Sequence, residues 1–189
     1  MCRLVSLTQA NCVESDGGIY ETRIIDFANI ADIVFNTTPM DPNYGEITDV
    51  VTVGTGEVFS YVFDDDDTAF YNQTGVRQNK KHTVTQQAFF KFAGIDSAKV
   101  SFANGIKGCC ELFAFHFANS GSIFAQGIDF DEATDTWLKS KQRAKATVNI
   151  LTDTGANEDR VEVFINSVGR CFSPLTTMTP TEIDAIDNT

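Results

Sequence analysis

The sequence predicts a mainly β fold, a sandwich or a barrel, with one short α-helix packed against it. Short runs of β-branched and aromatic residues, separated by turn-forming residues, fill most of the 189-residue chain. The composition includes 16 Phe against one Trp, and aromatic side chains favour strands. Within the Phe-rich stretch 83–128, one segment has the apolar spacing of three and four residues that is typical of a helix. The length suits one domain with a core large enough to fold without disulfides.

The first strands are expected near the N-terminus, after an N-terminal arm and the turn signal ESDGG. Residues 19–27 and 30–35 form short apolar runs, and the second ends at the loop-forming sequence NTTPMDPNYG. Residues 47–53 and 57–63 are β-branched and aromatic, and a Gly-Thr-Gly connection joins them. Glycines there can take positive φ, so the sequence predicts a hairpin over 47–63 that is available for assembly. The polar tract that follows, DDDDTAFYNQTGVRQNKKH, has no clear periodicity and is predicted to be an exposed loop.

The stretch 83–128 is predicted to supply the core. Strand 83–93 alternates Val84, Ala88, Phe90 and Phe92 on one face, with Phe89 on the other. Asp96 suits the N-cap of a helix that ends at Gly108, with an apolar face of Ile95, Ala98, Phe102 and Ile106. Strand 111–118 is apolar on both faces, with Phe113, Phe115 and Phe117 on one side, as expected of a central strand.

The last third of the chain is predicted to form further strands and a tail. The sequence DFDEATDTW suits a hairpin turn, and residues 139–150 suit a strand with a basic ridge on one face. Residues 161–168 form the last strong strand. A β-rich domain is therefore expected over 1–173, followed by a polar tail over 174–189 with a small helix started by Thr179, Pro180 and Glu182.

No assembled catalytic or metal-binding signature is present in the sequence. His82 lies in the polar tract and His116 in the Phe-rich strand, and neither has a nucleophile motif around it. Asp64 to Asp67 lack EF-hand spacing, so a solvated acidic loop explains them better than calcium. The acidic cluster from Asp129 to Asp135 consists of turn residues, which need no metal to explain them. Five cysteines in no metal spacing predict reduced thiols rather than a disulfide framework. The sequence therefore predicts a non-enzyme without cofactor or metal.

The charged residues form the one pattern in the sequence that suggests a binding partner. The formal net charge of −12 disfavours general nucleic-acid binding. Three interpretations of the basic ridge stay open: contact with nucleic acid, an exposed face without a partner, and contact with an acidic patch on a neighbouring copy. The residues proposed for self-assembly on the third interpretation are Asp64, Asp65, Asp66, Asp67, Asp129, Asp131, Lys139, Lys141, Arg143 and Lys145.

The order of elements resembles a known family. The segments GGIYETRIIDFANIADI, TVTQQAFFKF and ELFAFHFANSGSIFAQGI, with a hairpin and a short helix between them, resemble the tail-tube (major tail protein) family of tailed phages of Bacteroidetes-type hosts. The pattern is also similar to tube proteins of contractile injection systems. The resemblance implies a ring of copies, expected to be a hexamer, whose hairpins surround a lumen. Stacked rings would form a conduit for DNA, with other tail or neck proteins as neighbours.

The function expected from this resemblance is that of a structural virion protein of the tail tube, assembled in the bacterial cytoplasm. An acidic lumen would let DNA pass without adhering, whereas a basic ridge that faced the lumen would depart from this pattern. A neck or head-to-tail connector ring is the nearest alternative. A carbohydrate-binding β-sandwich is an alternative of another class, and it would need an exposed aromatic platform. No secretory signal or membrane anchor is expected.

Overall fold

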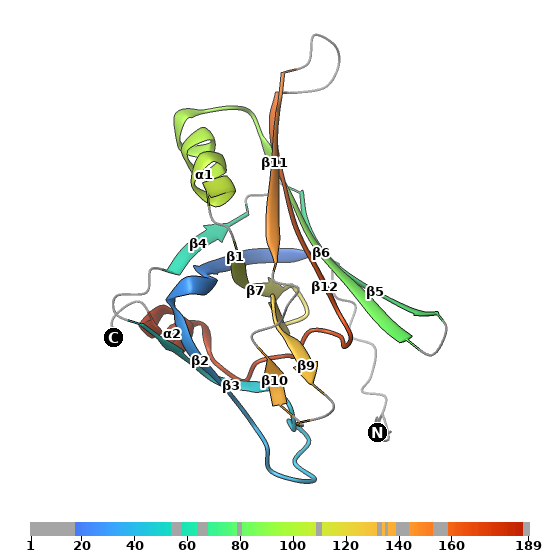
Figure 1. The fold of residues 1–189 in the computed structure, drawn as a ribbon. Coiled ribbons are helices and arrows are strands. Elements are labelled where there is room, and N and C mark those ends of the chain that lie inside the picture. The colour runs from blue at the N-terminus through green and yellow to red at the C-terminus, as the bar shows by residue number, and fades with distance from the viewer. Residues whose placement is uncertain are drawn as a thin grey trace.

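The computed structural model describes residues 18–53, 58–63, 68–78, 81–108, 111–131, 134, 136–138, 144–152 and 159–186 (Figure 1). The elements are β1 (Ile19–Asp26), the 3-10 helix η1 (Phe27–Asn29), β2 (Ile30–Phe35), β3 (Ile47–Thr52), β4 (Val58–Val62), β5 (Thr68–Gln78), β6 (Lys81–Ala93), α1 (Ser97–Gly108), β7 (Leu112–Ala118), β8 (Ile123–Gln126), β9 (Asp129–Asp131), β10 (Thr136–Leu138), β11 (Lys145–Leu151), β12 (Arg160–Gly169) and α2 (Pro180–Ala185). The mainly β prediction is confirmed.

Two four-stranded antiparallel sheets form the body of the domain. The first sheet has the order β4-β1-β7-β8, and the second sheet has the order β11-β12-β6-β5. A third, smaller layer is the antiparallel pair β2–β3. A second small pair is formed by β9 and β10, in the region where the sequence predicts a turn.

Strand β7 is buried on both faces because the first sheet is the middle layer. Leu112 and Ala114 lie in a first core with Phe90, Val163 and other residues of the second sheet. Phe113, Phe115 and Phe117 lie in a second core on the opposite face, with residues of β2, β3 and α2. Each buried Phe side chain contributes about 1.5 to 3 kcal/mol of transfer free energy. The central position predicted for this strand is confirmed.

The predicted hairpin over 47–63 is wrong. β3 pairs with β2, with Ile33 opposite Val50, whereas β4 pairs with β1, with Ile24 opposite Phe59. The chain forms one long hairpin instead, whose first arm is β1 and β2 and whose second arm is β3 and β4. Its reversal is the loop 36–46, where the backbone N–H of Gly45 bonds to the carbonyl of Asn36 at 2.8 Å. A Gly-rich connection permits a reversal but does not require one, and long-range pairing decides which strands meet.

The polar tract predicted as a loop is also different in the structure. Its residues 68–78 form β5, an edge strand that pairs with β6 along its whole length, from Thr68 opposite Lys91 to Gln78 opposite Lys81. His82 therefore lies on β6, opposite Arg77. Backbone pairing stabilises an edge strand, so its side chains need no apolar periodicity. Residues Asp64 to Asp67 lie outside the described residues.

The predicted core helix is confirmed at its start. The Asp96 side chain accepts a hydrogen bond from the backbone N–H of Lys99 at 2.7 Å, and this bond is the main reason that the pKa of Asp96 is lowered. The apolar face differs from the prediction, because Ala98 is exposed and Ala103 is buried instead. The helix contacts β11 and β12 at the edge of the first core.

The C-terminal segment is an integral part of the domain rather than a polar tail. Met178, Ile183 and Ile186 are buried in the second core. Residues on either side of Thr176 bond to β3, with the N–H of Ile47 donating to the carbonyl of Leu175 at 2.9 Å. The boundary expected at residue 173 therefore does not separate a tail from the packed unit. The small helix predicted at Thr179 is confirmed as α2, with a complete capping box.

Candidate functional site

The residues predicted for self-assembly are only partly described by the structure. Asp129 begins β9, and its carboxylate accepts a hydrogen bond from the backbone N–H of Arg170 at 2.8 Å. Lys145 begins β11 and is exposed, while Asp131 ends β9. The other seven of these residues lie outside the described residues: Asp64, Asp65, Asp66, Asp67, Lys139, Lys141 and Arg143. The contact expected between an acidic cluster of one copy and the basic ridge of another therefore stays a prediction.

A buried polar network lies between the two large sheets, centred on His116 of β7. The imidazole is fully buried, its Nδ1 is 3.0 Å from the Thr22 hydroxyl, and its Nε2 is 2.9 Å from Oε1 of Gln126. The Gln126 amide nitrogen donates to the carbonyls of Gln86 and Ile165, each at 3.1 Å. Because these acceptors fix the orientation of the Gln126 amide, its oxygen faces the histidine. His116 therefore carries its proton on Nε2 and accepts from Thr22 at Nδ1.

The environment of His116 keeps the ring neutral. Burial lowers the pKa of His116 to about 4, and the hydrogen bond to Gln126 acts in the opposite direction. The Tyr71 ring stacks on the imidazole at a centroid distance of 4.5 Å, and its hydroxyl bonds to Ser173. Burial also raises the pKa of Tyr71. Within the described part of the chain, every buried side-chain nitrogen and oxygen has a partner, so this network is fully hydrogen-bonded and stabilises the contact between the two sheets.

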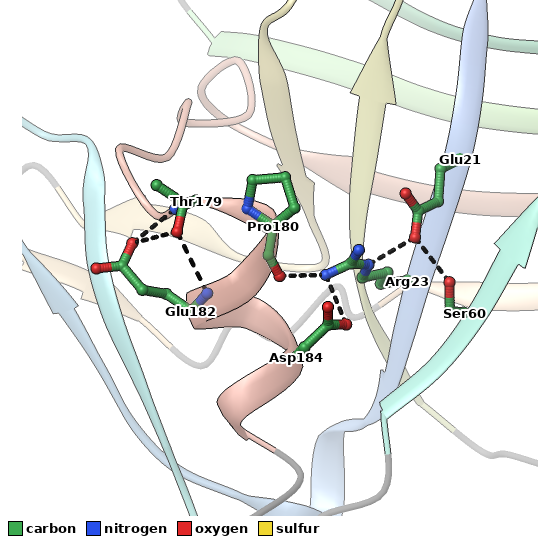
Figure 2. A network of polar contacts seen from close by, with 7 residues as sticks. All are labelled: Glu21, Arg23, Ser60, Thr179, Pro180, Glu182 and Asp184. Atoms are coloured by element: carbon green, nitrogen blue, oxygen red, sulfur yellow. Dashed lines mark hydrogen bonds and ion pairs between the residues drawn. The ribbon is translucent and has the colours of Figure 1, made fainter.

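A second polar network joins β1 to the C-terminal helix (Figure 2). The Arg23 side chain is only 7% exposed, and its Nε lies 2.7 Å from Oε1 of Glu21. Its Nη1 lies 2.8 Å from Asp184 of α2 and also donates to the carbonyl of Pro180. The guanidinium also lies over the Phe117 ring, 4.7 Å from the ring centroid. Arg23 thereby fixes α2 against the first sheet.

Glu21 completes this network on its other side. Its Oε1 also accepts a hydrogen bond from the hydroxyl of Ser60 on β4, at 2.7 Å. Alternation places Glu21 and Arg23 on the same face of β1 as the buried Ile25. Sequence reasoning missed both residues, because charged side chains in a strand are normally assigned to the solvent face. The available signal was that Arg23 and Glu21 lie two and four residues before Ile25, so strand alternation puts them on its face.

Replacing Thr179 with alanine is expected to destabilise the protein by about 1 kcal/mol, because the N-cap oxygen that accepts from Glu182 is lost. Thr179 also donates its backbone N–H and hydroxyl to the Glu182 carboxylate, at 2.7 and 2.9 Å, and these bonds lower the pKa of Glu182. Urea unfolding at pH 7 measures the change. Thr179→Ser keeps the oxygen and should lie close to the wild type, so equal losses in the two variants would contradict the capping role.

Two surfaces remain as candidates for contacts with other molecules. The first is a row of three rings across the outer face of the second sheet, which we name the Phe ladder: Phe70, Phe89 and Phe164. Their ring centroids are 5.1 Å apart for Phe70 and Phe89, and 4.8 Å apart for Phe89 and Phe164. The neighbours in sequence, such as Phe90 and Val163, are buried in the first core. The ladder therefore faces away from that core, and its rings are partly exposed.

The second surface is the β2–β3 hairpin, which extends away from the two large sheets at the bottom of Figure 1. Val34 and Val51 on its outer face are 41% and 43% exposed. Met40 in its loop is 97% exposed and adopts a positive φ of 68°. Backbone bonds across the loop, together with a bond from the Thr38 N–H to the Asn36 side chain at 3.0 Å, hold this conformation.

The described residues contain no group of three or more His, Cys, Asp or Glu side chains placed to hold a metal ion. Over the same ranges, no helix is both long enough and apolar enough to cross a bilayer. Comparison with protein-family models gave no match, and no curated protein or solved structure is significantly similar to the chain. The fold and the two exposed surfaces are the features of the molecule that bear on its function.

Proposed function

We propose that the protein is a self-assembling structural component of a tailed-phage virion, and specifically a tail-tube protein that forms stacked rings around a DNA conduit. The observation that carries this proposal is the β2–β3 hairpin, which presents Val34, Met40 and Val51 to solvent from a folded domain. Exposed apolar side chains on a rigid projecting hairpin are typical of an interaction surface. The element order that resembles the tail-tube family also supports the proposal.

The chemistry of the buried polar groups agrees with a structural role. Both ring nitrogens of His116 are hydrogen-bonded, and Arg23 forms ion pairs with Glu21 and Asp184. Catalytic groups normally lie in a cleft with access to substrate. In the described part of the chain, both networks contribute instead to the packing of layers. The net charge of −12 is compatible with a wall along which DNA moves without adhering.

Electron microscopy of the purified protein tests the proposal. We expect long hollow tubes at high protein concentration, since a tube protein assembles through contacts within and between rings. Isolated rings that do not stack would favour a neck or connector protein. A protein that stays monomeric at every concentration and binds glycans would contradict the proposal and favour a carbohydrate-binding module.

A further inference from the structure

The two exposed surfaces lie on opposite outer faces of the domain. The first sheet is the middle layer. The second core lies between it and the β2–β3 hairpin, and the first core lies between it and the second sheet. Val34 and Val51 point away from the buried Val50, and the Phe ladder points away from the first core. One copy therefore cannot bring its own hairpin against its own ladder.

Lysine side chains flank the Phe ladder, and one of them, Lys91, lies directly opposite Glu162. In the strand register, Lys91 lies one row from the ladder on one side, and Lys145 lies one row from it on the other. Arg160 is also on this face, where it pairs with Glu162 at 2.7 Å. On this face of β6, β11 and β12, Glu162 is the one acidic side chain.

The hairpin carries the opposite charge. The sequence contains no lysine or arginine between Arg23 and Arg77, so every charged side chain of the hairpin is acidic. On its outer face, Asp32 lies opposite Val51, and Asp49 lies opposite Val34. The loop adds Asp41 and Glu46, and burial together with the charge of Asp41 raises the pKa of Glu46. The hairpin thus presents two valines and a methionine surrounded by carboxylates.

We propose that the β2–β3 hairpin of one copy packs on the Phe ladder of a second copy, with Asp32 and Asp49 next to Lys91 and Lys145. This contact rests on the proposed self-assembly and assigns the surfaces that would perform it. Apolar side chains meet apolar rings, and the carboxylates beside the two valines meet the lysines beside the ladder. Phenylalanine has no polar edge to bond a sugar hydroxyl, so a dry protein surface suits the ladder better than a glycan.

The contact is heterologous, because a different surface of each copy takes part. Such contacts generate closed rings or open helical filaments, depending on the rotation between copies. The hydrogen bonds that hold the loop 36–46 reduce the conformational entropy lost when the hairpin docks. The geometry therefore suits repeated assembly rather than a single dimer.

The test uses two charge-reversed variants of the full chain and measures their size by analytical ultracentrifugation. The hairpin variant is D32K/D49K, and the sheet variant is K91E/K145E. Each alone should need at least about tenfold more protein to assemble than the wild type, because close interfacial charge pairs contribute that much or more. A 1:1 mixture of the two should assemble with the two variants alternating, because the reversed hairpin fits the reversed ladder and the unchanged hairpin of the sheet variant fits the unchanged ladder of the hairpin variant. Combining all four substitutions in one chain should restore assembly.

Matched controls separate this contact from general effects of charge. R77E/K107E changes the same number of exposed charges away from both surfaces and should assemble as the wild type does. F89T/F164T removes two rings of the ladder and replaces them with β-branched threonines, which favour strands, and on its own it should lose assembly as the sheet variant does. Circular dichroism confirms that each variant is folded.

Three outcomes would overturn the contact. Normal assembly of the hairpin and sheet variants, with the wild type forming rings or tubes, would exclude this interface but leave the proposed function in place. A wild type that is monomeric at every concentration would exclude both. Binding of xylohexaose to the wild type, lost in F89T/F164T, would assign the ladder to carbohydrate instead.

Discussion

Replacing Arg23 with methionine is expected to lower the free energy of unfolding by about 3 to 5 kcal/mol, because it leaves the buried carboxylate of Glu21 without its cation. The substitution also removes the bond to the Pro180 carbonyl and the contact with the Phe117 ring. Urea unfolding at pH 7 measures the loss. Since Arg23 joins β1 to α2, the amide protons of α2 should also exchange faster in the variant.

Two further variants separate burial from charge in this network. Asp184→Asn removes the other carboxylate partner of Arg23. The Asp184 side chain is 62% exposed, so the expected loss in the free energy of unfolding is below about 1 kcal/mol. The double variant E21M/R23M replaces the buried pair by apolar side chains and should be more stable than R23M alone. Equal losses in Asp184→Asn and R23M, or a double variant less stable than R23M, would contradict this explanation.

The stability of the protein is expected to fall by about 3 kcal/mol between pH 6.5 and pH 4 through His116 alone. The unfolded chain binds a proton on this histidine near pH 6.5, whereas the folded chain does so only near pH 4. Over this range the unfolded state holds more protons, so acid favours unfolding. The contribution is fully present above pH 6.5 and is lost as the pH falls to about 4.

Urea unfolding measured at intervals from pH 7 to pH 4 tests this dependence. Carboxylates also titrate at the acidic end, so the informative quantity is the difference between the wild type and His116→Gln, which should shrink as the pH falls. The matched control is His82→Gln, because His82 is exposed on β6. This control should keep the pH dependence of the wild type. A constant difference between the wild type and His116→Gln would show that burial does not disfavour the charged imidazole.

Local sequence patterns predicted several elements correctly. The strands over 83–93, 111–118 and 161–168 appear as β6, β7 and β12, and the caps at Asp96 and Thr179 are formed. These elements are specified by interactions within a few residues, such as side-chain alternation and N-cap hydrogen bonds. The buried faces of β6 and β12 were likewise visible in their alternating apolar residues.

Long-range pairing was not visible in the same patterns. The Gly-rich connection after β3 suggested a local reversal, yet β3 and β4 each pair with a strand that precedes them by many residues. β5 has no apolar alternation, and its place in the sheet comes from backbone pairing with β6. Local turn chemistry and side-chain periodicity contain little information on such partners.

The candidate site was also only partly predictable from the sequence. The sequence indicated an acidic chain with charged clusters, and it identified His116 as a residue within an apolar strand. It did not indicate that Thr22, Gln86 and Gln126 would enclose that histidine, or that Arg23 would bond to Glu21 and to α2. The contacts of His116 with Thr22, of Gln126 with Gln86 and of Arg23 with Asp184 join residues far apart in the chain.

The sequence by itself determined that the protein is mainly β, where the Phe-rich core lies, and how both helices begin, because these properties depend on composition, alternation and capping over short distances. Only the tertiary structure decided that the first sheet is the middle layer, that the C-terminal segment covers its second core, and that a Phe ladder and an acidic hairpin lie on opposite faces. The physical reason is that the order of strands in a sheet is selected by burial and backbone pairing between distant segments.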